Sequence, residues 1–430
     1  MALVFAAFLV LLLLGMPVAF AIGISGFLFF LFTDGIPLTI TVQKALSTTQ
    51  SFTMLAIPLF IFAGNLMNNT GITTRIMRLS NVLTGHLYGN LAQVSCVMST
   101  LMGGVSGSAV ADAAMESRIL GPEMLRQGYS RGWAAGINGL SALIVATIPP
   151  SMGLIIYGSV GEVSIGRLFA AGLLPGLIMM VFLMGSVTIS ARRRGYVPEK
   201  AKMASLGEIF RCCVECIWAL LFPILLLLFI RYGLMTPSES GAFAIFYALF
   251  VGTVIYRELT WEKFVKTLVD SVKDISAITL ILAFSGIFGY GVVYDRLPQG
   301  IAMLLSGITS NGVVLLVVVV FVLLILGMFM ETTVIALLMT PILLPVVQSV
   351  GVDPVHFGIL MMTTVTFGVM TPPVGVALYT VSTIMECPPE ETTRESMAFY
   401  IAIVTVVAIL LLFPSVSLIV PNLIFGVAQY

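Results

Sequence analysis

Two proline breaks inside apolar segments hold the residues of this sequence that are best suited to chemistry. The first is IPPSMGLIIY at residues 148–157, and the second is MTPPVGVALY at residues 370–379. Proline has no backbone N–H and its ring clashes with the preceding turn, so a helix breaks there and leaves carbonyl oxygens unpaired. In lipid such oxygens are tolerated only where protein covers them or where water or ions reach them. Two broken helices at matching places in two halves of a chain indicate an ion and substrate site near the middle of a membrane.

A stretch rich in glycine and serine, residues 103–108, offers a second set of oxygen atoms. It separates two apolar segments, 91–102 and 109–120, which are each too short to cross a bilayer and therefore predict a re-entrant hairpin. Oxygen ligands with little formal charge suit a monovalent cation, because divalent cations usually recruit carboxylates. The tip and the first break together predict a first sodium site, formed by Ser106, Ser108, Val145, Ile148 and Pro150.

The same arrangement recurs about 222 residues later (372 minus 150, from the paired prolines). Segments 313–326 and 334–347 flank a second tip at 327–333, and the second break follows within 356–384. Symmetry then predicts a second sodium site at Gly327, Glu331, Thr366, Met370 and Pro372. The alternative is that tips and breaks serve close helix packing alone, as small residues do in membranes. The match of four elements favours ion sites.

Carboxylates stand beside both tips, at Asp112 and Glu331. A charge within a membrane segment is costly and usually functional. The alternative is that these residues cap hairpin helices or pair with an arginine. Helix N-termini that face the same cavity would hold a substrate carboxylate through unpaired N–H groups. The predicted substrate contacts are Ser108, Asp112, Ser151, Thr332 and Pro373.

Glu239 is a carboxylate with a different expectation. It follows Thr236 by three residues, in the first turn of a helix that would start at Pro237. This spacing favours a helix cap over a functional role.

The composition indicates a polytopic all-α membrane protein. Of its 430 residues, 59% are hydrophobic and only 9% are charged, and the mean hydropathy is +1.10. Soluble domains carry about 25% charged residues, whereas repeated apolar stretches of about 20 residues are typical of membrane spans. A net charge of zero without a concentrated basic patch predicts no nucleic-acid partner. The sequence has no GxxxxGK[ST] loop, so we expect neither ATP hydrolysis nor an organic cofactor.

These segments divide the chain into two repeats joined by a charged linker. The first repeat has membrane helices with an interfacial arm at 1–51, followed by transport elements at 52–190 with a hairpin at about 89–125 and a broken helix at about 133–160. A cytoplasmic linker follows at 191–212. The second repeat has helices with a second arm at 213–274, followed by transport elements at 275–430 with a hairpin at about 300–350 and a broken helix at about 356–384. A cytoplasmic linker puts sixteen of the 20 Lys and Arg residues on that side, if the second repeat is inverted.

Five motifs in this order resemble the large membrane subunit of the tripartite ATP-independent periplasmic (TRAP) transporters, within the wider ion-transporter superfamily. They are GVSGS at 104–108, IPPS at 148–151, TPSE at 236–239, PILLP at 341–345 and TPPVG at 371–375. The resemblance runs nearly end to end, and it implies inverted repeats in a scaffold and an elevator-type moving part. It also implies sodium-coupled import of an organic acid, such as a C4-dicarboxylate or sialic acid, across the bacterial inner membrane.

The resemblance carries further expectations about ions, partners and site residues. It implies about two sodium ions, a separate small four-helix membrane subunit and a periplasmic substrate-binding protein, all working at the lipid bilayer. By position it gives the same first sodium site. Many relatives have glycine where Val145 stands, and some have aspartate where Glu331 stands, in an otherwise apolar second tip.

Two other functions compete with the tripartite importer. One is a stand-alone sodium/anion symporter of the same superfamily that needs no periplasmic receptor. The other is an intramembrane serine protease, because GVSG at 104–107 matches GxSG, with Ser106 as nucleophile and His86 or His356 as base. A serine protease would not need the second hairpin, which has no serine opposite Ser106. We therefore expect a transporter rather than an enzyme.

Overall fold

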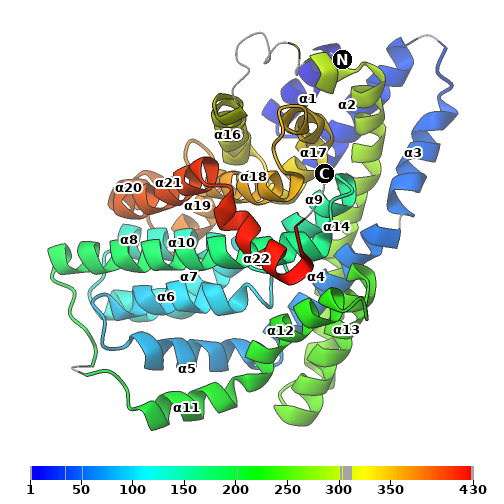
Figure 1. The fold of residues 1–430 in the computed structure, drawn as a ribbon. Helices are drawn as coiled ribbons and strands as arrows, with labels where there is room; N and C mark the ends of the chain where they lie inside the picture. The colour runs from blue at the N-terminus through cyan, green and yellow to red at the C-terminus, as the bar shows by residue number, and fades with distance from the viewer. Residues whose placement is uncertain are drawn as a thin grey trace.

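The computed structural model describes residues 2–300, 303 and 312–427, apart from residues 34, 51 and 201. Over these residues the chain is helical and contains no strand, which confirms the predicted all-α class (Figure 1). Four helices in this part of the chain are long and apolar enough to cross a membrane, or up to 6 if each of two bent helix pairs counts as one span. The four are Ile165–Arg194, Pro237–Ile255, Trp261–Tyr294 and Gly312–Phe329.

In the part of the chain that the structure describes, the first repeat opens with five α-helices and one 3₁₀ turn. Gly15, with a φ of 79°, and Pro17 separate the first two helices, since neither residue continues a helix. The elements are α1 (Ala2–Leu13), α2 (Val18–Phe32), α3 (Thr39–Thr49), the 3₁₀ turn η1 (Phe52–Leu55), α4 (Ala56–Asn68) and α5 (Ile72–Thr84).

The first hairpin and the first broken helix follow. The hairpin consists of α6 (Asn90–Met102) and α7 (Ala109–Arg126), joined at the tip 103–108. The broken helix consists of α8 (Arg131–Ser141), the 3₁₀ turn η2 (Ala142–Ile144) and α9 (Met152–Val160). The 30-residue α10 (Ile165–Arg194) ends this repeat at Gly195, whose φ of 75° suits a helix C-terminus.

The second repeat begins with α11 (Leu206–Glu215), α12 (Ile217–Arg231), α13 (Pro237–Phe250), the π-helical turn η3 (Val251–Ile255) and α14 (Trp261–Tyr294). Thr236 and Glu239 form a capping box at the start of α13, where the Glu239 carboxylate accepts from the Thr236 backbone N–H at 2.7 Å. The prediction that Glu239 caps a helix is confirmed. The expected arm at 261–274 and the expected span from 275 are parts of one continuous helix, because α14 runs through both without interruption.

The remaining helices are α16 (Gly312–Phe329), α17 (Thr332–Gln348), α18 (Pro354–Gly368), α19 (Val376–Ile384), α20 (Pro389–Glu395), α21 (Met397–Leu412) and α22 (Ser415–Phe425). Thus α16 and α17 form the second hairpin, and α18 and α19 form the second broken helix. Residues 301, 302 and 304–311 of the predicted hairpin at about 300–350 lie outside the described residues.

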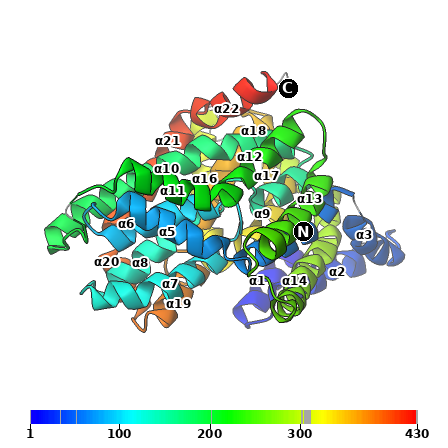
Figure 2. The ribbon, with the colours of Figure 1, turned by 90° about the horizontal axis from the view of Figure 1, so that it is seen from below.

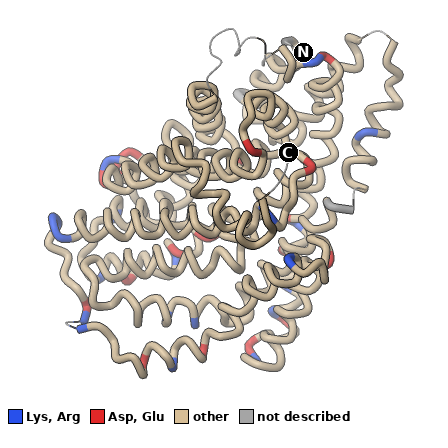
Figure 3. Tube along the Cα trace, in the orientation of Figure 1, with Lys and Arg blue, Asp and Glu red and all other residues tan. Residues whose placement is uncertain are grey.

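The helices gather into two groups in both ribbon views (Figures 1 and 2). At one side α2 and α3 pack against α14, and aromatic pairs such as Phe30 and Tyr290, with ring centroids 5.4 Å apart, fill the contact. The hairpins, the broken helices and α10 form the rest, and α4 packs against α13, α14 and α9 between the groups. Figure 3 shows charged residues mostly near helix ends and in connections, as an apolar bilayer requires.

Candidate functional site

The tip of the first hairpin touches the first proline break. Gly107 has a φ of 67°, and a Cβ atom added there would lie 2.7 Å from the carbonyl oxygen of Pro150. At Gly103 an added Cβ would lie 2.7 Å from the Cβ of Ile148. Only glycine allows this approach, so the backbones on either side of the predicted first sodium site are in contact.

The break leaves carbonyl oxygens free, as proline chemistry predicts. Within the described chain, the carbonyls of Val145, Ile148 and Pro150 accept no hydrogen bond, although Val145 N–H itself donates to Ala142. The helix then restarts at α9, where Ser151 Oγ accepts from the Leu154 N–H at 3.4 Å. Ser151 is therefore a buried helix cap next to three unpaired oxygens.

Asp112 bonds to the tip rather than to a helix end or an arginine. Ser106 Oγ donates to Asp112 Oδ2 at 2.5 Å, and Asp112 Oδ1 is buried without a partner in the described chain. This contact also bears on the protease alternative. The Ser106 hydroxyl points to a carboxylate, while His356 Nδ1 is bonded to Ser417 Oγ at 2.7 Å, so His356 is not positioned as its base.

The tips of both hairpins line one small cavity, called the central cavity below. Its walls come from the first tip, the first break, the start of α9, the second tip and α18; they include Gly107, Ser108, Ala146, Gly153, Glu331, Thr332, Thr333 and Met362. The cavity volume is about 20 Å³. That is room for one water molecule or a bare ion and far too little for an organic acid.

The second hairpin is held against the second broken helix in a similar way. A Cβ added at Gly327 would lie 2.5 Å from the carbonyl oxygen of Val365, so α16 and α18 are in backbone contact. The Gly375 N–H donates to the Met328 carbonyl at 2.7 Å. The Met370 carbonyl accepts a hydrogen bond from the Tyr400 hydroxyl, so it is not free as the carbonyls of the first break are.

The residues predicted for the second sodium site therefore do not all lie around one cavity. Glu331 lines the central cavity and accepts from the hydroxyl of Thr333. Thr366 lies buried in α18, where its hydroxyl donates to the Met362 carbonyl at 2.6 Å. Pro372 and Pro373 are exposed. Among the predicted substrate contacts, Ser108 and Thr332 line the cavity, and Pro373 does not.

A buried polar cluster behind the first tip was missed in the sequence. The Glu116 carboxylate, 0% exposed, accepts from the hydroxyls of Ser95 at 2.5 Å, Ser99 at 2.6 Å and Ser141 at 3.1 Å. Its position in the sequence could have indicated it, because Glu116 follows Asp112 by four residues and therefore lies on the same face of the helix.

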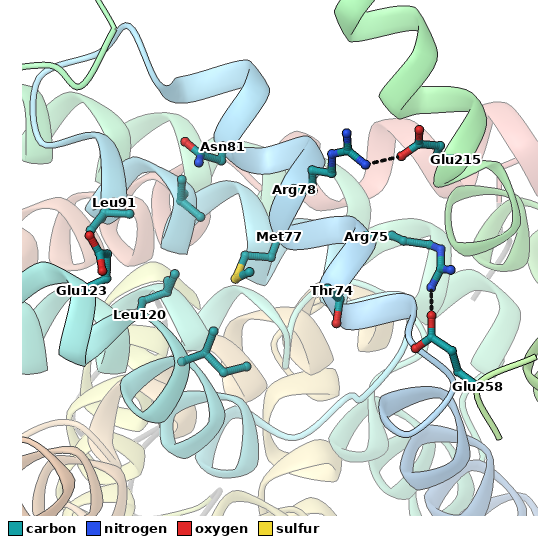
Figure 4. A pocket seen from close by; sticks show the side chains of 12 residues that line it. Thr74, Arg75, Met77, Arg78, Asn81, Leu91, Leu120, Glu123, Glu215 and Glu258 are labelled. Carbon is teal, nitrogen blue, oxygen red and sulfur yellow. Dashed lines mark hydrogen bonds and ion pairs between the residues drawn. The ribbon is translucent and has the colours of Figure 1, made fainter. Parts of the chain in front are cut away.

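A larger cavity of about 730 Å³ opens between α5, α6 and α7 (Figure 4). Two ion pairs close one side of it, from Arg78 to Glu215 at 2.9 Å and from Arg75 to Glu258 at 2.7 Å. The wall on the side of α6 and α7 includes Leu91, Leu120 and Glu123. The volume suits a small organic molecule.

Comparison with known proteins adds an independent line of evidence. The profile of the family described as "Tripartite ATP-independent periplasmic transporter, DctM component" matches residues 5–416. The chain is 36% identical to the sialic acid TRAP transporter large permease protein SiaM of Vibrio cholerae, over 97% of this chain and 98% of that protein. It is 34% identical to the 2,3-diketo-L-gulonate TRAP transporter large permease protein YiaN of Escherichia coli, over 93% and 94%. The fold is similar to that of the Alcanivorax borkumensis YdaH transporter, with a TM-score of 0.62, 11% identity and 88% of each chain covered.

Proposed function

The chain belongs to the DctM family of tripartite ATP-independent periplasmic transporters, and from this premise we propose that it imports an organic acid with sodium ions. The observation that carries the proposal is the central cavity, where the two hairpin tips and the first break meet. Ser108 and Ala146 line this cavity, and the unpaired carbonyl oxygens of Ile148 and Pro150 belong to the break that touches the same tip. Neutral oxygen ligands of this kind suit a small monovalent cation, and the carboxyl group of Glu331 lies in the same cavity wall.

Sodium coupling gives the first testable prediction. The purified chain, reconstituted in proteoliposomes with its small subunit and binding protein, should accumulate its organic acid when sodium is outside. Replacement of external sodium by choline should abolish uptake, because choline is too large for the central cavity. The measurement is initial uptake of radiolabelled sialic acid, 2,3-diketo-L-gulonate and a C4-dicarboxylate. Unchanged uptake in choline would exclude sodium as the coupling ion.

The size of the central cavity supports a moving substrate site. About 20 Å³ cannot hold an organic acid, so the substrate must bind when the tips and their surroundings rearrange. We propose an elevator motion in which the hairpins and broken helices move against the group of α2, α3, α13 and α14. Under the topology from the positive charges, the cavity of about 730 Å³ between α5 and α7 then faces the cytoplasm and serves substrate release.

The partners follow from the family and remain part of the proposal. They are a small membrane subunit of four helices, encoded as a separate chain, and a periplasmic protein that binds the acid first. The complex would work in the bacterial inner membrane.

Receptor dependence is the second testable prediction, and it separates the tripartite importer from a stand-alone symporter. Sodium-driven uptake should fall to background when the binding protein is omitted, because free acid would not open the periplasmic side. The same vesicles are then supplied with the binding protein, which should restore uptake. Full uptake without the binding protein would support the stand-alone symporter instead.

A further inference from the structure

The Glu116 cluster inside the first hairpin has no role in the sodium mechanism. It is formed by Glu116 on α7, Ser95 and Ser99 on α6, and Ser141 on α8. The Glu116 side chain is completely buried, and within the described chain no Lys, Arg or His forms an ion pair with it. A permanent, unpaired charge is costly at such a position.

The partners of Glu116 suit both protonation states of a carboxyl group. A hydroxyl can donate or accept, since its hydrogen rotates. All three serines can donate to a carboxylate, and after protonation one of them can turn and accept from the acid. The change requires only rotation of a hydroxyl and no movement of the backbone.

The same contacts leave no room for a metal ion between the Glu116 carboxylate and the serine hydroxyls. The serine oxygens lie 2.5, 2.6 and 3.1 Å from the carboxylate oxygens, in direct hydrogen-bond contact. An ion between them would have to push the three helices apart. A proton needs no such space.

Unused hydrogen-bonding groups flank the cluster on α7 and on α8. Asp112 lies one turn before Glu116 on the same face of α7, and its Oδ1 has no partner in the described chain. Asn138 precedes Ser141 by one turn on the face of α8 that reaches Glu116; it is 0% exposed, and neither its Oδ1 nor its Nδ2 has a described partner. The free Oδ1 of Asp112, on the side of the tip, and the free amide of Asn138, on the other side, can each bond a water molecule that carries a proton.

The other direction along the same helix face leads to open space. Leu120 and Glu123 follow Glu116 by four and seven residues, so they continue its face of α7, and both line the cavity of about 730 Å³ (Figure 4). On α6, Leu91 of the same cavity wall lies one turn before Ser95. The Glu116 cluster thus lies between the ion-binding tip and a cavity that water can enter.

We propose that Glu116 binds and releases a proton, so that the first hairpin carries a protonation site in addition to the proposed sodium site. The neighbouring elements offer few competing groups. On α6, the titratable side chain close to Glu116 is Cys96. On α8 it is Arg131, which forms an ion pair with Glu386 at 3.0 Å, and η2 has no titratable side chain. The side chain of Tyr379 on α19 is exposed. On α7 itself the remaining charged groups are Asp112, Arg118, Glu123 and Arg126.

The test is infrared difference spectroscopy of the purified chain in lipid nanodiscs between acidic and alkaline buffer. Wild type should show a carboxylic-acid C=O band that exchanges slowly in D₂O, because the group is buried. Glu116→Gln should lose the Glu116 component of this band, and Glu116→Asp should keep that component at a shifted frequency; any component from Asp112 or Glu331 should remain in both variants. The matched control is Glu123→Gln on the same helix, which should remove only a band that exchanges at once.

A slowly exchanging band that persists unchanged in Glu116→Gln, or its absence from wild type, would overturn the proposal. Gel filtration of each variant shows whether it is folded, and Glu116→Asp provides a second measurement if Glu116→Gln is not. The spectra need neither substrate nor partner. If the spectra show no protonation of Glu116, the proposal of sodium-coupled transport is unaffected. If no sodium-coupled transport is measured, the spectra still test the protonation of Glu116. Once a transported acid is known, Glu116→Gln should also flatten the dependence of uptake on pH.

Discussion

Gly107→Ala should reduce the initial rate of sodium-driven uptake at least about tenfold, a change worth about 1.4 kcal/mol. The new Cβ would stand 2.7 Å from the carbonyl oxygen of Pro150 and would push it away from the tip. That oxygen is one of the predicted sodium ligands. We therefore expect half-saturation at a higher sodium concentration, which uptake at graded sodium concentrations measures.

Gly128→Ala is the matched control for this substitution. Gly128 has a φ of 84°, close to the 67° of Gly107, so alanine meets similar backbone strain at both positions. No atom lies within 4 Å of a Cβ built at Gly128. Its variant should keep its sodium dependence. Equal sodium dependence in both variants would show that contact between the tip and the break is not needed.

Gly172→Ala should lower the apparent melting temperature of the purified chain by several degrees. Gly172 lies in α10, and a Cβ there would lie 2.0 Å from the carbonyl oxygen of Thr147 in the first break. No atom pair tolerates that distance, so α10 or the break must shift, at a cost of about 1–3 kcal/mol or more. Thermal unfolding in detergent, followed by fluorescence, measures the change.

The control lies in the same helix. Gly185 of α10 has nothing within 4 Å of its added Cβ, and alanine favours helix by about 1 kcal/mol over glycine. Gly185→Ala should therefore melt at the wild-type temperature or slightly above it. If Gly172→Ala behaved in the same way, the close packing of α10 on the first break would be refuted.

Proline made the breaks predictable from the sequence. The loss of an N–H at Pro150 and at Pro372 and Pro373 is a local property, and it needs no knowledge of the fold. The tips were predictable for a similar reason, since glycine and serine between half-length apolar segments do not continue a helix. The meeting of the two tips was not predictable, because it brings residues more than 200 positions apart, such as Ser108 and Glu331, to the wall of one cavity.

The pairing of the two repeats illustrates this limit. From the prolines the offset was taken as about 222, yet the N-cap residues of α7 and α17, Ser108 and Glu331, differ by 223 (331 minus 108). The cis peptides Pro149–Pro150 and Pro372–Pro373 have the same offset. Glu331 is thus the counterpart of Ser108, and both line the central cavity. At this offset the counterparts of Ile148 and Pro150 are Thr371 and Pro373 instead of Met370 and Pro372, whereas Glu331 keeps its place in the second site.

Glu116 and α14 show two further limits. The spacing of Asp112 and Glu116 is equally compatible with an exposed face, and only the packing of α6 and α8 onto α7 decides that Glu116 is buried. In α14, the charged residues Lys273 and Asp274 suggested a boundary at the membrane surface. No glycine or proline stands there to stop the helix, so the backbone hydrogen bonds continue through the change in polarity.

The unbroken α14 has a mechanical consequence. Its 34 residues form a rod about 50 Å long, whereas the hydrocarbon core of a bilayer is about 30 Å thick. At least one end must therefore project well past the acyl chains, and the charged first turns identify which end that is. A force from lipid headgroups on the projecting end is transmitted directly to Phe284 and Phe288, which contact α2 and α1. Bilayer thickness and surface charge can thus set the tilt of α14 together with the helices α1 and α2 that it contacts.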